Sequence, residues 1–272
     1  MQFLSKLFFF FCIIQSPFFS RAQDSIHEKP LLNEFKELAK YNTPIEYKFD
    51  SITVYAICTG YISTNKKYPE PVFVWLIKTP IGNYLIDGGL SPNITDPDYF
   101  KGISKTVFNH QFDFYIYKTN NLTTQLEKLG VSKNLKSIIL THGHFDHIGY
   151  LNSLNKVPVI ISLTEKDQIE TFGQAMGYEK GTENQIDFKR CEVIKLGDNE
   201  IKTLNKYISI IKTGHHTKGH MMILVNSGKT KLLFTGDINL NSLPHDNEIY
   251  KFIDAKFKIS TLKLFFNHDQ KL

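Results

Sequence analysis

Residues 137–147 read SIILTHGHFDH, and this stretch determines how the rest of the chain is interpreted. Its first four residues are mostly apolar and predict a short buried strand. The loop that follows then offers three imidazoles and a carboxylate within six residues: His142, His144, Asp146 and His147. Nitrogen and oxygen ligands of this kind suit a borderline divalent metal. A loop can direct alternate side chains to two neighbouring centres, and Gly143 allows the backbone to bend there. The stretch therefore predicts a loop-borne metal site.

Further ligands are expected at other strand ends, because a metal needs a convergent shell of donors. Three predicted strands end in residues of the same chemical kind. The segments concerned are 213–220 (TGHHTKGH), 235–237 (TGD) and 267–269 (NHD). Loops on a rigid scaffold are where functional residues concentrate. These three segments are therefore expected to provide the remaining ligands.

Apolar runs and turn signals predict the organisation of the remaining chain. Strands are expected over 52–58, 72–78, 83–87, 137–140, 159–162, 208–212, 221–225, 231–234 and 262–266. Helical spacing predicts a helix over 122–129 that stops at Gly130, and a short amphipathic helix around Leu32, Phe35 and Leu38. The aromatic-rich stretch 91–121 is expected to be irregular. Continuous apolar strands are buried on both faces and require helices outside them, so residues 23–272 are expected to form one α/β domain.

Composition excludes two broad classes of protein. The chain has 272 residues, of which 42% are hydrophobic and 22% charged, a balance that is not typical of disordered proteins. Of its 32 basic residues only Arg21 and Arg190 are arginine. Arginine is the residue that binds phosphate or guanine through two hydrogen bonds, and the chain has almost none. The lysines are scattered among 27 acidic residues. A nucleic-acid partner is therefore not expected.

The first 22 residues have the pattern of a cleaved export signal. Lys6 precedes an apolar run over 7–14, Pro17 breaks that run, and Ser20-Arg21-Ala22 places small residues where signal peptidase reads. The run is too short for a membrane anchor, which needs about twenty apolar residues. We expect a mature chain from Gln23 in the periplasm or outside the cell. Cys12 would leave with the signal, and pairing of the remaining Cys58 and Cys191 stays open.

The whole pattern resembles the metallo-β-lactamase superfamily, and within it most of all the acyl-homoserine (quorum-quenching) lactonases. The resemblance runs from about Ile52 to the end and rests on three features. These are PVFVWL at 71–76 ahead of DGG at 87–89, Phe145 inside the histidine motif, and the ending FFNHD at 265–269. It implies a four-layer αβ/βα sandwich with two divalent metals, zinc being expected, at one edge.

The resemblance also implies roles for individual residues. His142, His144 and His216 would hold one metal, Asp146, His147 and His268 the other, and Asp237 would bridge them. A hydroxide shared by two metals about 3.5–4 Å apart would attack a lactone or ester carbonyl. Asp146 would deliver the proton to the leaving group. The partner implied is a small-molecule lactone or ester, N-acyl-homoserine lactones included, and a homodimer stays open.

Several residues depart from the family pattern or lie outside the ligand set. In the stretch that usually reads GHTPGH, His215 replaces the glycine and Lys218 the proline, so His215 either competes for the metal or faces solvent. His220 is expected to support a ligand from behind or to pack, and Asp87 to support a ligand or form a turn. No motif surrounds the three remaining histidines, which are expected at the surface: His27, His110 and His245.

One departure concerns the chemistry. The lactonases carry a tyrosine close to the substrate carbonyl at the position of Leu240, three residues after Asp237. A leucine cannot donate a hydrogen bond to a developing oxyanion. We therefore expect slow, broad hydrolysis of lactones and activated esters, and a gain in acyl-homoserine lactone turnover in Leu240→Tyr.

Four alternatives share part of the pattern. An organophosphate or phosphodiester hydrolase of this fold has the same seven ligands and is the main rival. A true β-lactamase lacks the bridging aspartate, and a thiolester hydrolase normally stays inside the cell. A non-catalytic metal-binding relative is the fourth, although such proteins usually lose ligands and none is missing here.

Overall fold

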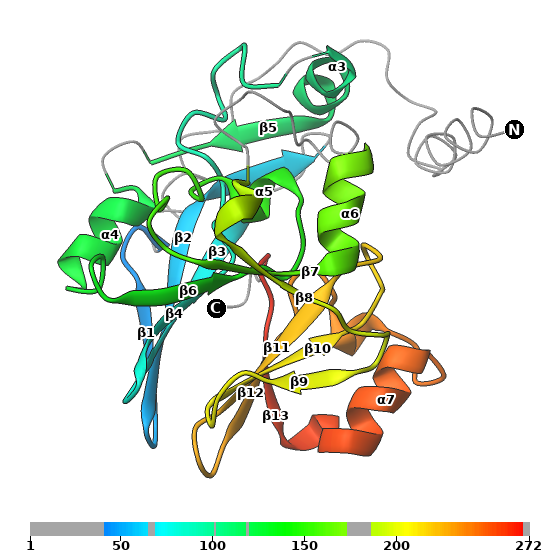
Figure 1. Cartoon of the computed structure of the whole chain (residues 1–272). Coiled ribbons are helices and arrows are strands. Elements are labelled where there is room, and N and C mark those ends of the chain that lie inside the picture. The colour runs from blue at the N-terminus through cyan, green and yellow to red at the C-terminus, as the bar shows by residue number, and fades with distance from the viewer. Residues whose placement is uncertain (1–40, 65–68, 101, 118–119, 173–185, 269–272) are drawn as a thin grey trace, which may run out of the picture. The chain divides into compact units, whose positions relative to one another are not determined.

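The computed structural model describes residues 41–64, 69–100, 102–117, 120–172 and 186–268. All of these belong to one unit of the chain, residues 38–272, shown as the coloured part of Figure 1. The predicted export signal and the predicted helix around Phe35 lie outside the described residues. None of the helices in the described ranges is long and apolar enough to cross a membrane.

Two β-sheets form the centre of the structure. The first has eight strands in the order β1-β2-β3-β4-β6-β7-β8, with β5 also paired to β2. Its strands are β1 Ile45–Phe49, β2 Ile52–Thr64, β3 Glu70–Thr79, β4 Gly82–Ile86, β5 Phe112–Tyr115, β6 Leu135–Ile139, β7 Val159–Ser162 and β8 Cys191–Ile194. The second has five strands in the order β13-β12-β11-β10-β9. These are β9 Ile201–Thr203, β10 Ile208–Lys212, β11 Met221–Asn226, β12 Lys231–Phe234 and β13 Leu262–Phe265.

Alternating side chains explain why the two sheets stack. Successive residues of a strand point to opposite faces, so an apolar strand can bury both sides. In β3, Phe73, Trp75 and Ile77 pack with residues of β10, β11 and β12 in a core between the sheets. Val74 and Leu76, on the opposite face of the same strand, pack in a second core. The prediction of sheets buried on both faces is therefore confirmed.

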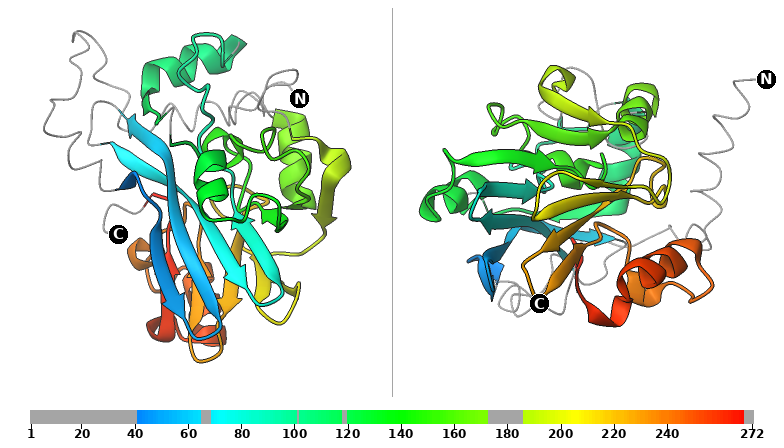
Figure 2. Two further views of the ribbon diagram at one scale, coloured as in Figure 1. Left: turned by 90° about the vertical axis from the view of Figure 1, so that its left-hand side faces the viewer. Right: turned by 60° about the horizontal axis from the view of Figure 1, so that its bottom comes forward.

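Helices cover the two outer faces. The helices are α3 Gly102–Gln111, α4 Leu122–Lys128, α5 Phe145–Ile148, α6 Leu163–Phe172 and α7 Glu248–Phe257. Buried residues of α4, α5 and α6 pack on the outer face of the first sheet. Residues of α7 pack on the outer face of the second sheet, as Figures 1 and 2 show. The order is helices, sheet, sheet, helix, which confirms the expected four-layer αβ/βα sandwich.

Strand direction brings the predicted motifs to one edge. β4 and β6 are parallel, and β10, β12 and β13 run the same way because β10 and β12 are each antiparallel to β11. Parallel strands place their carboxyl ends, and the loops that follow, at a common edge. Backbone hydrogen bonds join the sheets there: Met221 N–H donates to Thr141 O and Phe73 N–H donates to Asn267 O.

The apolar strands match their predicted ranges closely, whereas several helices and short strands were missed. The strands expected over 159–162, 208–212 and 231–234 are found with the same bounds. The expected helix over 122–129 ends one residue earlier. The stretch 91–121 is not wholly irregular, because it contains α3 and β5. The sequence reading also did not predict β1, β8, β9, α5, α6 or α7.

The two cysteines of the described chain are free thiols. Cys58 lies on β2 and Cys191 on β8, with four strands of the first sheet between them. Neighbouring strands are about 4.8 Å apart, so roughly 24 Å separates the two residues, whereas a disulfide needs Cα atoms within about 7 Å. Pairing of Cys58 with Cys191 is therefore incompatible with the fold.

Both thiols are expected to react slowly in the folded protein. Burial raises the pKa of Cys58 to about 12 and that of Cys191 to about 11. At pH 8 only about one Cys191 in a thousand is then a thiolate, so iodoacetamide should label it on the order of 100-fold more slowly than a free cysteine. Cys58 should be labelled only on unfolding. Rapid native labelling of both sites, followed by mass spectrometry, would contradict this expectation.

Candidate metal centre

The structure brings all seven predicted ligand residues together at the common edge of the two sheets. They form two groups that share one carboxylate. The three-histidine group consists of His142, His144, His216 and Asp237, and the two-histidine group of Asp146, His147, His268 and Asp237. Within each group the candidate ligand atoms lie within 4.8 Å of one another. Each group takes two residues from the segment after β6 of the first sheet, where Asp146 and His147 lie on α5, and two from loops of the second sheet.

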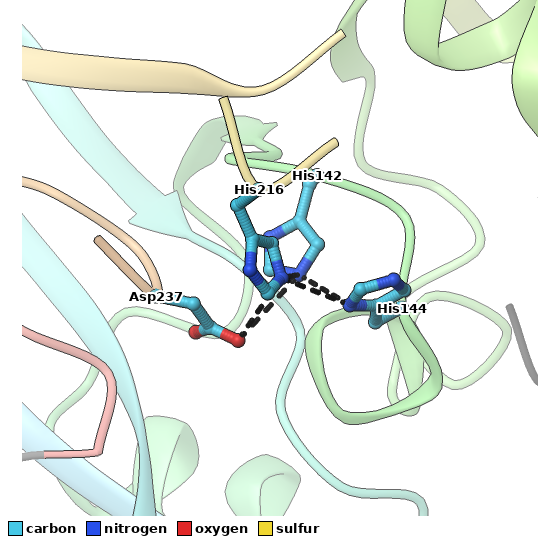
Figure 3. Close-up of side chains that lie close together, drawn as sticks. All are labelled: His142, His144, His216 and Asp237. Carbon is cyan, nitrogen blue, oxygen red and sulfur yellow. Dashed lines mark hydrogen bonds and ion pairs between the residues drawn. The ribbon is translucent and has the colours of Figure 1, made fainter. Parts of the chain in front are cut away.

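In the three-histidine group the ring nitrogens face one another (Figure 3). His142 Nε2 is 2.9 Å from His144 Nδ1 and 3.0 Å from His216 Nε2. His216 Nε2 is 3.1 Å from His144 Nδ1 and 3.4 Å from Asp237 Oδ2. The three nitrogens and the carboxylate oxygen thus converge on one point.

The two-histidine group uses the other oxygen of the same aspartate. Asp237 Oδ1 is 3.0 Å from His147 Nε2 and 3.5 Å from His268 Nε2. Asp146 Oδ2 is 3.2 Å from His268 Nε2 and 3.5 Å from His147 Nε2. One oxygen of Asp237 therefore faces each group, which is the arrangement that a bridging carboxylate requires.

Hydrogen bonding shows that these donor sets fit cations. His147 Nδ1 lies 2.9 Å from Asp87 Oδ2, an acceptor, so Nδ1 carries a proton. Burial lowers the pKa of this ring, but the facing carboxylates raise it overall, and in its metal-binding form the ring presents a lone pair at Nε2. That lone pair faces the carboxylate oxygen Asp237 Oδ1. Within the described part of the chain, both buried atoms are without a hydrogen-bond partner. A divalent cation would satisfy the lone pairs of both atoms at once.

The pKa values favour the metal-binding form of the histidines in the three-histidine group. Burial lowers the pKa of His144 to about 4, and the neighbouring His216 acts in the same direction. Burial likewise lowers the pKa of His142 and of His216. These rings are therefore neutral at physiological pH, and a neutral imidazole is the form that ligates a metal.

Asp87 supports the two-histidine group from behind, as one of the two sequence interpretations had it. The carboxylate is fully buried and accepts from Thr141 N–H at 2.7 Å and Thr141 Oγ1–H at 2.8 Å. It also accepts from Asn267 Nδ2 at 2.7 Å, in addition to the bond with His147. Four donors therefore fix the carboxylate that orients the His147 ring.

The sequence analysis missed three residues that hold the site: Thr141, Asn267 and Glu165. The first two are direct neighbours of predicted ligands and could have been noted for that reason. Glu165 is a buried carboxylate at the start of α6, and it accepts from Gly143 N–H at 2.7 Å and Thr217 Oγ1–H at 2.6 Å. Burial raises its pKa, against the opposing effect of these hydrogen bonds. Its signal was the helix-start pattern of Ser162 followed three residues later by glutamate.

The other histidines lie outside both groups. His215 is exposed to solvent, which answers the question of whether it competes with His216. His220 is fully buried, with Nδ1 2.8 Å from Thr213 Oγ1, and it packs as expected. His110 and His245 are exposed, as predicted. His27 lies outside the described residues.

An aromatic cluster adjoins the centre. The Phe145 ring, between two ligand residues in sequence, has four phenylalanine rings with centroids 5.1–5.8 Å away: Phe100, Phe108, Phe112 and Phe114. Phe100 is buried core, whereas Phe108, Phe112 and Phe114 are half-buried. The cluster is therefore partly core packing and partly apolar surface that a ligand could contact.

Leu240 does not face the candidate metal centre. Its side chain is fully buried in the core beneath α7, with Ile249 and Ile253. The expectation that Leu240→Tyr restores an oxyanion donor is therefore revised, because a tyrosine side chain there would enter a packed core. We expect this variant to unfold about 1–3 kcal/mol more easily and to gain no lactone turnover. Thermal unfolding and initial rates check this; an unchanged midpoint with faster turnover would contradict it.

The sequence around this site matches a known protein family. The sequence profile of the Metallo-beta-lactamase superfamily matches residues 68–256, which include six of the seven predicted ligands. The chain belongs to this superfamily. It is accordingly a metal-dependent hydrolase with the fold described above, and the predicted resemblance is confirmed.

Individual relatives point the same way. A curated N-acyl homoserine lactonase from Bacillus cereus is 24% identical over 221 residues, which cover 73% of this chain and 81% of the lactonase. A structure of a mutant AiiA from B. thuringiensis with N-decanoyl-L-homoserine at its active site is 18% identical, with a TM-score of 0.62 over 84% of this chain and 95% of that one. AidC, a dizinc quorum-quenching lactonase, is 17% identical with a TM-score of 0.57, over 83% and 90%. The structural likenesses establish a shared fold.

Proposed function

We propose that the chain is an exported dinuclear metal hydrolase that opens lactones or esters, N-acyl-homoserine lactones included. The observation that carries this proposal is the division of Asp237, whose Oδ2 faces the three-histidine group while Oδ1 faces the two-histidine group. The sequence relatives that are lactonases, and the dizinc lactonase of the same fold, support it.

The seven residues would hold two divalent cations, zinc being the expected metal. His142, His144 and His216 would hold one, Asp146, His147 and His268 the other, and Asp237 would bind both. Two such cations supply a nucleophile at neutral pH and polarise the carbonyl oxygen under attack. The chain's own contribution is to hold seven donors in place, with Asp87 keeping the proton of His147 on Nδ1.

Asp146 is the proposed proton carrier. Its Oδ2 faces His147 and His268, which leaves Oδ1 as the oxygen that would deliver a proton to the leaving alkoxide. The Asp146 side chain is only 9% exposed, so bulk water has little access to the proton in transit. Neither a serine nor a cysteine nucleophile is needed for this chemistry.

The surroundings suggest a substrate with an apolar portion and a good leaving group. The half-buried rings of Phe108, Phe112 and Phe114 beside Phe145 would contact an acyl chain. Leu240 provides no hydrogen-bond donor for the oxyanion, and losing one such donor typically lowers the rate on the order of 10²–10³-fold. Activated esters and lactones should therefore react faster than unactivated acyl-homoserine lactones.

Export is part of the proposal. It rests on Lys6, the apolar run 7–14 and the small residues flanking Arg21, with cleavage after Ala22. N-terminal sequencing of protein recovered from its native compartment tests it. A chain that begins at Gln23 supports export, and an intact Met1 in a soluble cytoplasmic pool contradicts it.

A hydrolysis panel tests the proposed activity. Zinc-loaded protein starting at Gln23 should be assayed on lactones, aryl esters, phosphotriesters and β-lactams, with the metal-free protein as control. We expect metal-dependent hydrolysis of lactones and aryl esters. Activity confined to phosphotriesters would favour the organophosphate hydrolase, and activity confined to β-lactams a β-lactamase. Two bound metals with no turnover of any substrate would favour a non-catalytic relative.

A further inference from the structure

The start of α6 lies between the two loops that carry the three-histidine group. Gly143 separates His142 from His144, and a Cβ atom there would lie 2.4 Å from Ile169 Cδ1 of α6. On the other side, a Cβ atom on Gly219 would lie 2.1 Å from the backbone nitrogen of Glu165. Both distances are shorter than real contacts. At Gly219 the obstacle is the backbone of α6, so only glycine allows this approach, whereas at Gly143 it is the end of the Ile169 side chain.

The carboxylate of Glu165 connects these two loops. In the pattern Ser162-Leu163-Thr164-Glu165, the glutamate of a helix start ordinarily bonds back to the capping residue. Ser162 Oγ does cap the helix, accepting from Glu165 N–H at 3.0 Å. The carboxylate, however, accepts from Gly143 N–H through Oε1 and from Thr217 Oγ1–H through Oε2. Its two oxygens thus hold one loop each.

The loop of His216 is the one that most needs such a contact. His216 adopts φ of 66°, a left-handed conformation that is unfavourable for a residue with a Cβ atom. Its side chain is 29% exposed, whereas that of His142 is fully buried. The next residue, Thr217, is buried and bonded to Glu165. The strained ligand is therefore held through its neighbour.

We propose that Glu165 is a positioning residue that holds the loops of His142–His144 and His216 at ligating distance, and so sets the affinity of the three-histidine group for its cation. The inference rests on the proposed dinuclear centre. It concerns one half of that centre, because the Glu165 carboxylate accepts from Gly143 and Thr217, both on the loops of the three-histidine group. The two-histidine group is supported separately by Asp87.

Cation affinity, measured without substrate, tests the proposal. Apo-protein should be titrated with Zn²⁺ against a chromophoric chelator and with Co²⁺ by visible absorption, which resolve two binding steps. We expect Glu165→Ala to weaken one step about 10–100-fold, as loss of a group that orients ligands typically does, and the other step less than about threefold. Thr217→Val, which removes only the bond on the His216 side, should weaken the same step to a smaller extent.

Two further variants distinguish the hydrogen bonds of Glu165 from its negative charge, and from a general disturbance of α6. Glu165→Gln can keep both contacts, since its amide oxygen can accept from Gly143 while its NH₂ donates to the Thr217 hydroxyl. It should therefore bind within about fivefold of wild type. Glu170→Gln removes the same charge on an exposed turn of α6, where Glu170 pairs with Lys166, and should change neither step. Far-UV circular dichroism verifies that each variant is folded.

Each outcome decides the question. The positioning role would be overturned if Glu165→Ala bound both cations as tightly as wild type, or if it weakened both binding steps equally. It would also be overturned if Glu165→Gln bound cations as weakly as Glu165→Ala. Wild-type protein that binds fewer than two cations would instead overturn the dinuclear centre itself. Selective weakening without lactone hydrolysis by the wild type would leave the positioning role standing and remove only the proposed substrate.

Discussion

Asp237→Ala is expected to lose hydrolytic activity by a factor on the order of 10³ or more while remaining folded. The carboxylate is the only side chain shared by the two groups, so its loss removes a donor from each. Electrostatic help from a metal amounts to several kcal/mol, and about 4 kcal/mol corresponds to roughly a 10³-fold change in rate. Initial rates on the best substrate of the panel, together with metal content by elemental analysis, measure both consequences.

Two companion variants make this result specific. Asp237→Asn keeps the shape of the side chain but removes the charge between the two groups, and it should lose nearly as much activity. Asp246→Ala makes the same alanine change at an exposed aspartate nine residues later and should match wild type. Near-normal turnover and two metals per chain in Asp237→Ala would show that the shared-carboxylate role is wrong.

Removal of metal is expected to lower thermal stability as well as to abolish activity. Ligands that bind only the folded state stabilise it, by about 4 kcal/mol when their free concentration is a thousand times Kd. For a domain of this size that corresponds to a fall in Tm on the order of 10 °C on chelation. Differential scanning calorimetry of zinc-loaded and chelated protein measures the shift, and elemental analysis should return two metals per chain.

The ligand variants provide the control for this stability effect. In Asp237→Ala, chelator should shift Tm far less than in wild type, because the variant no longer holds both metals tightly. A wild-type Tm that does not respond to chelator, with one metal or fewer after reconstitution, would count against the dinuclear centre.

Much of the fold was predictable because apolar strands leave a strong signal. β7, β10 and β12 are short runs of buried residues with polar ends, and their bounds follow from composition alone. The seven convergent residues were predictable for a related reason, since each follows a strand whose carboxyl end lies at the same edge of its sheet.

Some of what was missed lacks such a signal. All three residues of β9 are exposed, so the strand has no apolar face and is held by pairing with β10. Glu165 has no metal-binding motif around it, and its partners Gly143 and Thr217 are 22 and 52 residues away in sequence. The inward burial of Leu240 was equally invisible, because a motif position gives no side-chain direction.

The two sheets contribute equally to each half of the centre, and this has a mechanical consequence. Each cation would be gripped by two residues from the loops of one sheet and two from the loops of the other, so loading would cross-link the layers at that edge. The two cysteines of the described chain both lie in the first sheet and are free thiols, so they provide no covalent link between the layers. In the metal-free protein, hydrogen bonds such as those from Met221 N–H to Thr141 O and from Phe73 N–H to Asn267 O would have to hold this edge without the cations, and we expect it to open more readily. Slower amide exchange at Met221 in the metal-loaded protein than in the metal-free protein would show this effect.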